Sequence, residues 1–244
     1  MLAWHDTAWA QSPAELQAAR ETELPDLRLV DAQQVDSRMS SLGIRFGYLE
    51  KDVRPGDTGR YFCGGLSTDR SAAATPAVAA ALARLPYESV RKLGLRFVIL
   101  CGAAKEGERP IGGINVPPLN LLMLEVGPSL ERTTLHELYH LAESRYNTLA
   151  DADWDRQFAG YANGYVPDLL KGALGSGKPG FLTAYAETFP YEDRAVLFEA
   201  LVFEPGNVLA QIRATGDSVL RRKVLYMEEK SARLLDVKLA LGRL

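Results

Sequence analysis

Residues 133–142 read Thr-Thr-Leu-His-Glu-Leu-Tyr-His-Leu-Ala. It contains a His-Glu-x-x-His pattern in a run that is typical of a helix. Residues four apart on a helix share one face, so His136 and His140 can offer two imidazole nitrogens to one metal ion. Glu137 lies beside them, where its carboxylate can take a proton from a water molecule.

The surroundings of the motif favour a metal site over a chance match. Leu135, Leu138 and Leu141 make the helix largely apolar, which predicts that it is buried. Two imidazoles and a carboxylate in a buried helix cost free energy unless a partner satisfies them, and a zinc ion would do so. Two of the three histidines of the chain lie in this motif. The alternative is a structural helix with an accidental motif, which would hold no stoichiometric zinc.

A third ligand must come from elsewhere, because the longer motif with a glycine and a third histidine is absent after His140. Glu143 lies on the same helix, and one unbroken helix cannot place three side chains around one ion. Glu192 opens a downstream amphipathic helix, and Ala195 one turn later would let that helix approach the first closely. An acid at this position can also serve only the helix dipole. The spacing favours Glu192 as the ligand.

The composition is that of a globular protein that can bury its own core. The chain has 244 residues, 47% of them hydrophobic, and a net charge of −3, so nothing indicates a nucleic-acid partner. The short run Arg221-Arg222-Lys223 is assigned to a solvated helix face. No apolar run approaches the roughly 20 residues that a membrane span needs.

The N-terminal residues and the cysteines bear on the compartment. Residues 1–25 are polar and are predicted as a peripheral segment, with 26–244 as a single domain. Ala8-Trp9-Ala10, within residues 1–10, has the small-x-small form of a signal-peptidase site, which favours an exported protein without excluding a cytoplasmic one. Cys63 and Cys101 could form a disulfide in an oxidising compartment, or Cys101 could be a buried free thiol.

The remaining pattern predicts strands that flank the motif helix. Three segments alternate or run apolar as strands do: 44–49, 95–101 and 120–126. A helix is expected from 76 to 92 with Thr75 as its N-cap, and a polar loop over 102–113. Pro117-Pro118 next to 120–126 favours a sheet edge, and an edge strand near the metal could pair with an extended substrate.

A second stretch, residues 185–195, reads Tyr-Ala-Glu-Thr-Phe-Pro-Tyr-Glu-Asp-Arg-Ala. Together with the motif it resembles the gluzincin zinc metallopeptidases related to the catalytic domain of anthrax lethal factor. In that group a tyrosine stands seven residues before a ligand glutamate, and an alanine follows in the same helix. Tyr185, Glu192 and Ala195 match those positions. The resemblance covers roughly 95–205, and it implies that Glu192 is the third zinc ligand and Tyr185 a catalytic hydroxyl.

One family position differs in this chain. The acid that usually follows the alanine is Val196 here, and Asp193 or Glu199 could supply the carboxylate that orients a ligand in that group. The resemblance gives the chemistry and not the substrate.

We therefore expect a zincin-like α+β fold: a small twisted mixed sheet packed on the motif helix, with a mainly helical C-terminal half. The expected activity is zinc-dependent hydrolysis of peptide bonds in a peptide or protein, as an endopeptidase rather than an exopeptidase. Zn²⁺ would be held by His136, His140 and Glu192, with Glu137 as general base. The alternative is a non-catalytic binding or regulatory module that keeps the zincin scaffold.

Overall fold

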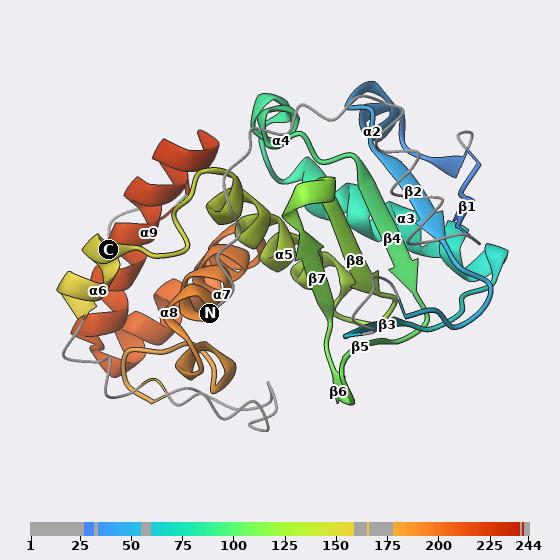
Figure 1. Cartoon of the computed structure of the whole chain (residues 1–244). Coiled ribbons are helices and arrows are strands. Elements are labelled where there is room, and N and C mark those ends of the chain that lie inside the picture. Colours follow the sequence, from blue (N-terminus) through green and yellow to red (C-terminus); the bar gives the residue numbers. More distant parts are fainter. Residues whose placement is uncertain are drawn as a thin grey trace.

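The computed structural model describes residues 27–31, 34–54, 60–158, 165, 178–239 and 241. Within these ranges the N-terminal half carries the strands and the C-terminal half is helical, with helix α5 (Leu130–Arg145) between the two (Figure 1). The expected mixed α+β fold is confirmed. The predicted peripheral segment 1–25, including residues 1–10, lies outside the described residues.

The larger sheet has five strands in the order β1-β2-β4-β8-β7. These are β1 (Arg28–Leu29), β2 (Arg45–Tyr48), β4 (Phe97–Cys101), β8 (Leu121–Glu125) and β7 (Gly113–Val116). The central strands β2, β4 and β8 run parallel, and β1 and β7 pair antiparallel at the two ends. The central strands β4 and β8 are apolar along nearly their whole length because both of their faces are covered.

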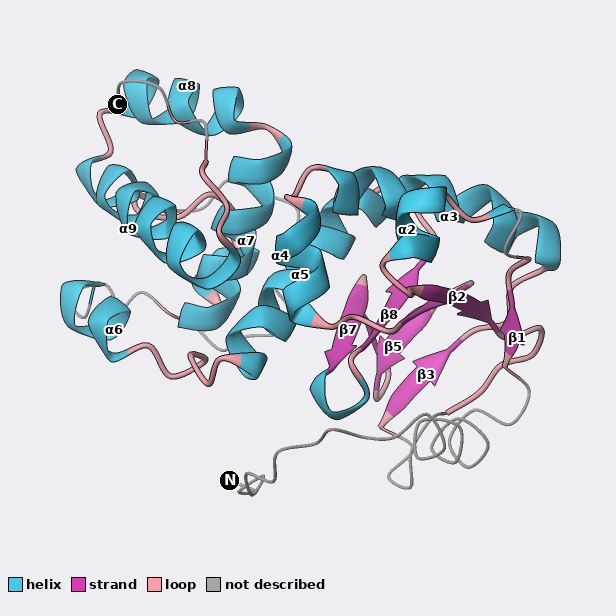
Figure 2. Cartoon of the chain, turned by 90° about the horizontal axis from the view of Figure 1, so that it is seen from above, coloured by secondary structure: helices cyan, strands magenta, loops and turns pink. Residues whose placement is uncertain are grey.

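Helices cover one face of this sheet and a second, smaller sheet covers the other (Figure 2). The helical layer contains α2 (Ser37–Ser41), α3 (Thr68–Ala83), α4 (Tyr87–Leu93) and α5. The smaller sheet has the order β3-β5-β6, formed by β3 (Tyr61–Cys63), β5 (Ala104–Glu106) and β6 (Arg109–Pro110). A disulfide between Cys63 and Cys101 joins β3 to β4, so the two cysteines that the sequence left open are bonded and buried.

The C-terminal half packs against α5 through α7 (Pro190–Phe203). Around it lie α6 (Ala152–Phe158), α8 (Pro205–Thr215), α9 (Ser218–Leu235) and the short 3-10 helix η4 (Tyr185–Glu187). Proline occupies the first position of α7 and of α8, where its missing N–H costs nothing. No single helix in the described part of the chain has the length and apolar composition to cross a membrane; the bent pair α7 and α8 passes by length and composition only.

The predicted sheet edge is wrong. Strand 121–125 is β8, which lies between β4 and β7, so the edge is β7 (Gly113–Val116). Pro117-Pro118 belong to a 3-10 turn, η2 (Pro117–Leu119), that connects the edge strand to its neighbour. The proline pair therefore marks the turn between the two strands rather than an edge in the second of them.

Three other local predictions need correction. The single helix expected from 76 to 92 is two helices. The first, α3, begins at Thr68, capped by Ser67, because the alanine-rich residues before Pro76 favour helix and bury small side chains. It ends at Ala83, and α4 begins after Pro86. The predicted loop 102–113 contains β5 and β6. Lys223, expected on a solvated helix face, is completely buried in an ion pair with Asp193.

Candidate metal centre

Helix α5 holds the His-Glu-x-x-His motif in place because the apolar residues of the helix are buried in the main core. Leu135, Leu138 and Tyr139 are completely buried in the main core, between the sheet and the C-terminal helices. His136 and His140 are nearly buried as well, exposing 8% and 6% of their surface. The two imidazoles therefore have little freedom to turn away from the metal position.

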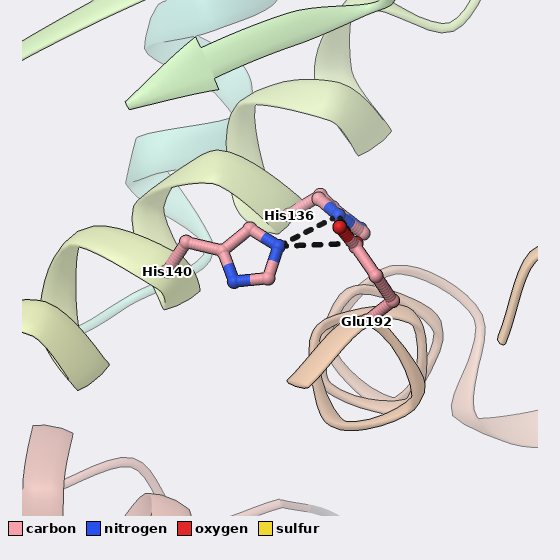
Figure 3. Close-up of side chains that lie close together, drawn as sticks. All are labelled: His136, His140 and Glu192. Carbon is pink, nitrogen blue, oxygen red and sulfur yellow. Dashed lines mark hydrogen bonds and ion pairs between the residues drawn. The ribbon is translucent and has the colours of Figure 1, made fainter. Parts of the chain in front are cut away.

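Helix α7 brings Glu192 to the same place. Pro190 fixes the start of the helix, so Glu192 lies in the first turn and points toward α5. Ala195, one turn later, is completely buried in the core that the two helices share. Figure 3 shows both imidazoles projecting from α5 toward the Glu192 carboxylate on α7. The small residue predicted to allow a close approach occupies this contact.

Three ligand atoms converge. The Glu192 Oε2 atom lies 3.0 Å from His136 Nε2 and 3.2 Å from His140 Nε2, and the two Nε2 atoms are 3.1 Å apart. Tetrahedral zinc with ligand bonds of about 2.0–2.1 Å separates its ligand atoms by roughly 3.3 Å. Two imidazole nitrogens and a carboxylate are also zinc's preferred donors, so the arrangement fits a zinc ion.

Glu199 contacts His136 at Nδ1, the ring nitrogen that faces away from Glu192. Its Oε2 atom lies 3.2 Å from His136 Nδ1, so the Nδ1 proton can be donated to the carboxylate and the lone pair of Nε2 is left for a metal. Glu199 stands seven residues after Glu192, which is two helical turns along the same face of α7.

Asp193, the other acid expected behind the ligands, faces away from them. Its carboxylate accepts hydrogen bonds from Lys223 Nζ at 2.6 Å and from the Tyr165 hydroxyl at 2.8 Å. Glu143, set aside as a ligand, is likewise turned away, because it is bonded to Arg194 and Lys230 in the core.

The charges of the site depend on one another. Burial lowers the pKa of His136, but hydrogen bonds to Glu192 and Glu199 outweigh burial and raise it well above its ordinary value. Burial would raise the pKa of Glu192, and hydrogen bonds from His136 and His140 reverse this and bring it far below the ordinary value. A carboxylate that stays ionised beside two imidazoles is suited to bind a cation.

The edge strand β7 holds a further polar residue of the site, Asn115, which the sequence analysis missed. The Asn115 side-chain amide donates to Glu137 Oε2 at 3.3 Å. At Gly113 an added Cβ would come within 2.9 Å of the Glu137 Cγ atom, so glycine permits this close approach. A polar residue between Ile114 and Val116 on an alternating strand was the available signal, and the misplaced edge hid it.

Tyr185 faces the metal centre from η4. Its ring centre is 5.9 Å from that of His136. Burial raises the pKa of Tyr185 well above its ordinary value, and the nearby charges of Glu192 and Glu137 raise it further. Tyr191, which the sequence analysis did not single out, lies 5.8 Å from the His140 ring. The hydroxyl of Tyr185 is therefore protonated and lies near the carboxylates of Glu137 and Glu192.

Comparisons with known proteins bear on the fold. No family model and no curated protein sequence matches the chain. A crystal structure from Bacteroides caccae, described as that of "a putative zinc-binding metallo-peptidase", has a similar fold, with a TM-score of 0.52. The similarity covers 96% of this chain and 91% of that one at 16% sequence identity. The chain therefore has a metallopeptidase-like fold, and the comparison does not distinguish the gluzincins related to lethal factor from other metallopeptidases.

Proposed function

We propose that this protein is a zinc-dependent peptidase of the gluzincin type. The observation that carries the proposal is the convergence of His136, His140 and Glu192 on one point, with Glu137 one residue from a ligand on the same helix. The fold that the chain shares with the Bacteroides caccae protein supports the same activity.

Each residue of the site has a separate role in the proposed hydrolysis. A zinc ion bound by the three ligands would polarise the scissile carbonyl and lower the pKa of a water molecule to about 7. Glu137 takes the proton of the attacking water and delivers it to the leaving amine, while Asn115 orients its carboxylate. The protonated hydroxyl of Tyr185 donates a hydrogen bond to the carbonyl oxygen as negative charge develops there.

The edge strand β7 is a suitable place for the substrate backbone. It ends the five-stranded sheet, and its residues Gly113 and Asn115 lie against Glu137. An extended peptide that pairs with a sheet edge presents successive carbonyl groups along that edge. This arrangement favours cleavage within a peptide or protein, so we propose an endopeptidase.

The cysteines support a proposal for the compartment. Disulfides persist in oxidising environments and are rare in the cytosol, so the Cys63–Cys101 bond supports an exported protein, as does the Ala8-Trp9-Ala10 pattern. We propose that the protein acts in the periplasm or outside the cell.

The test combines zinc content with activity on a mixed peptide library, for the wild type and for Glu137→Gln. Both proteins should bind one zinc ion, and the variant should lose about 10²–10⁴-fold of the hydrolysis rate, since a general base contributes that much. Stoichiometric zinc without cleavage by the wild type would favour a non-catalytic binding module instead. Full activity in Glu137→Gln would contradict the peptidase mechanism.

A further inference from the structure

The smaller sheet carries a row of side chains that the proposed reaction does not use. Strand pairing places Tyr61 opposite Glu106, and Glu106 opposite Arg109, so these three residues form one row across β3, β5 and β6. Residues directly opposite one another on paired strands project from the same face. Arg60 adjoins this row, with its guanidinium 5.4 Å from the Tyr61 ring centre.

One carboxylate in this row is shared by two guanidinium groups. Glu106 accepts from Arg60 Nε at 2.7 Å and from the Nη2 atoms of both Arg60 and Arg109. One negative charge therefore faces two positive charges. Arg109 and Glu106 are partly exposed, at 26% and 21% of their side chains, so the guanidinium of Arg109 remains accessible to a ligand.

The row projects from the face of the small sheet that packs against the large sheet. Tyr61 and Glu106 share their face of the small sheet with Cys63 and Ala104, which are buried in the apolar cluster next to the large sheet. Phe62 and Lys105 alternate with them and project from the opposite face, where the Lys105 ammonium lies 5.5 Å from the Phe62 ring centre.

The path of the chain limits the distance from Arg109 to the site. Arg109 stands four residues before Gly113, and four extended residues span at most about 13 Å. Gly113 lies against the general base Glu137. The electrostatics agree. Burial raises the pKa of Tyr185 and of Tyr191, and the positive charge of Arg109 partly lowers both. Burial also raises the pKa of Tyr61, and the negative charge of Glu137 adds to that increase.

We propose that Arg109, with Arg60 beside it, binds a carboxylate of the peptide substrate, so that the enzyme prefers substrates with a negative charge near the scissile bond. The inference rests on the proposed peptidase function. The planar fork of a guanidinium donates two parallel hydrogen bonds to a carboxylate, which gives both affinity and orientation. The carboxylate belongs either to a Glu or Asp side chain or to the C-terminus of the peptide.

The competing explanation is that the two arginines only clamp the β5–β6 hairpin through Glu106. The variant Glu106→Gln distinguishes the two explanations because they predict opposite results. Freed from Glu106, the arginines should bind a substrate carboxylate more tightly, and the preference for acidic peptides should rise. A lost clamp would instead reduce the cleavage of acidic and neutral peptides equally.

The experiment uses the zinc-loaded full chain and matched peptides that carry Glu or Gln at each position around the scissile bond, each with a free or an amidated C-terminus. The wild type should cleave one acidic series with kcat/KM roughly 10- to 100-fold above its Gln counterpart, mainly through KM, the range of a charged hydrogen-bonded pair. Arg109→Gln should bring the ratio of kcat/KM between Glu and Gln peptides close to 1, and Arg109→Glu should favour Lys peptides.

Lys105→Gln is the matched control, because Lys105 is the neighbour of Glu106 on β5 and projects from the opposite face. It removes one positive charge from the same strand and should keep the wild-type preference. Preference that depends on the Glu side chain assigns the carboxylate to an internal residue, whereas preference that amidation abolishes assigns it to the C-terminus.

Failure of this inference can be told from failure of the proposed function. Cleavage without any difference between Glu and Gln peptides overturns the role of Arg109 and leaves the peptidase standing. If the wild type cleaves nothing, the binding of labelled acidic and neutral peptides to zinc-loaded Glu137→Gln, measured by fluorescence anisotropy, decides the point. Equal dissociation constants there overturn the carboxylate site as well.

Discussion

Two glutamates on one face of α7 have separate tasks at the metal centre. Glu192 lies within 3.2 Å of both imidazole Nε2 atoms, whereas Glu199 contacts only the Nδ1 atom of His136, on the far side of the ring. The first is placed to bind the metal directly, and the second to hold the ring and raise the basicity of its other nitrogen. The two substitutions should therefore differ in their effect on zinc affinity.

Glu192→Gln should reduce zinc affinity more than Glu199→Gln, for which a loss of about 10- to 100-fold is expected from a residue that orients a ligand. Competition with a chelator of known affinity measures both. Glu131→Gln, in the partly exposed first turn of α5, is the control and should bind zinc as the wild type does. If Glu199→Gln lost more affinity than Glu192→Gln, the roles of the two residues would be reversed.

Removing the hydroxyl of Tyr185 distinguishes a catalytic protein from one that only binds a metal. Tyr185→Phe removes one donor directed at the developing oxyanion, so kcat should fall by roughly 10- to 10³-fold while zinc content and the unfolding midpoint stay unchanged. Tyr87→Phe, on α4, loses a hydroxyl that donates to the Ser41 carbonyl at the end of α2, and it should keep full activity. Wild-type turnover by Tyr185→Phe would leave Tyr185 with a packing role.

At the scale of elements, buried ion pairs fasten the C-terminal helices to α5. Glu143 on α5 accepts from Arg194 on α7 and Lys230 on α9, and Lys230 also bonds Asp151 at 2.6 Å. Tyr226 donates to the same Asp151 carboxylate. Breaking a buried pair leaves a charge without its partner, so this network makes the relative position of the three helices, and hence of the zinc ligands, costly to change.

Asp151 makes part of the free energy of unfolding depend on pH. Burial would raise the pKa of Asp151, but hydrogen bonds from Lys230, Trp154 and Tyr226 lower it below the usual 3.8. A group whose folded-state pKa is depressed stabilises the fold above the unfolded-state pKa, and this contribution is lost as the pH falls through the folded-state pKa. Asp151→Asn should thus cost about 1–3 kcal/mol at pH 7, and progressively less as the pH falls below about 4.

Urea unfolding at pH 7, 5, 4 and 3 measures that difference. Asp155→Asn is the matched control on the exposed side of α6, and its free energy of unfolding should follow that of the wild type throughout. A cost of Asp151→Asn that stayed constant down to pH 3 would show that the lost contact acts through packing rather than through the ionised carboxylate.

Helix positions could be predicted from the sequence more reliably than the order of the strands. The i, i+4 histidines and the Pro190–Glu192–Ala195 order correctly brought α5 and α7 together, because helical periodicity fixes which side chains share a face. Strand order was not recoverable in the same way. Asn115 was missed because the edge of the sheet was assigned to the wrong strand, and its partner Glu137 lies on a separate helix. Lys223 was placed in solvent because its buried partner Asp193 also lies on another helix.

For the whole molecule, the two halves contribute separately to the site. The proposed zinc ligands come from α5 and α7, which are held by the main core and the buried ion pairs. Arg109, proposed to bind the substrate, comes from the small sheet, and Asn115, which bonds Glu137, comes from the edge strand. The Cys63–Cys101 disulfide joins the small sheet to β4 across a sequence separation of 38 residues. Its removal should therefore affect substrate selection without disturbing the metal centre.

The variant that replaces both Cys63 and Cys101 with alanine tests this separation. Closing a loop of 38 residues restricts the unfolded chain and stabilises the fold by about 4 kcal/mol in the chain-entropy model. The unfolding midpoint should thus fall by roughly 10 °C for a chain of this size. Zinc affinity should remain that of the wild type, whereas the preference for acidic peptides should weaken, because β3 would no longer be tied to β4. Loss of zinc together with the disulfide would show that the two halves depend on each other for the metal centre as well.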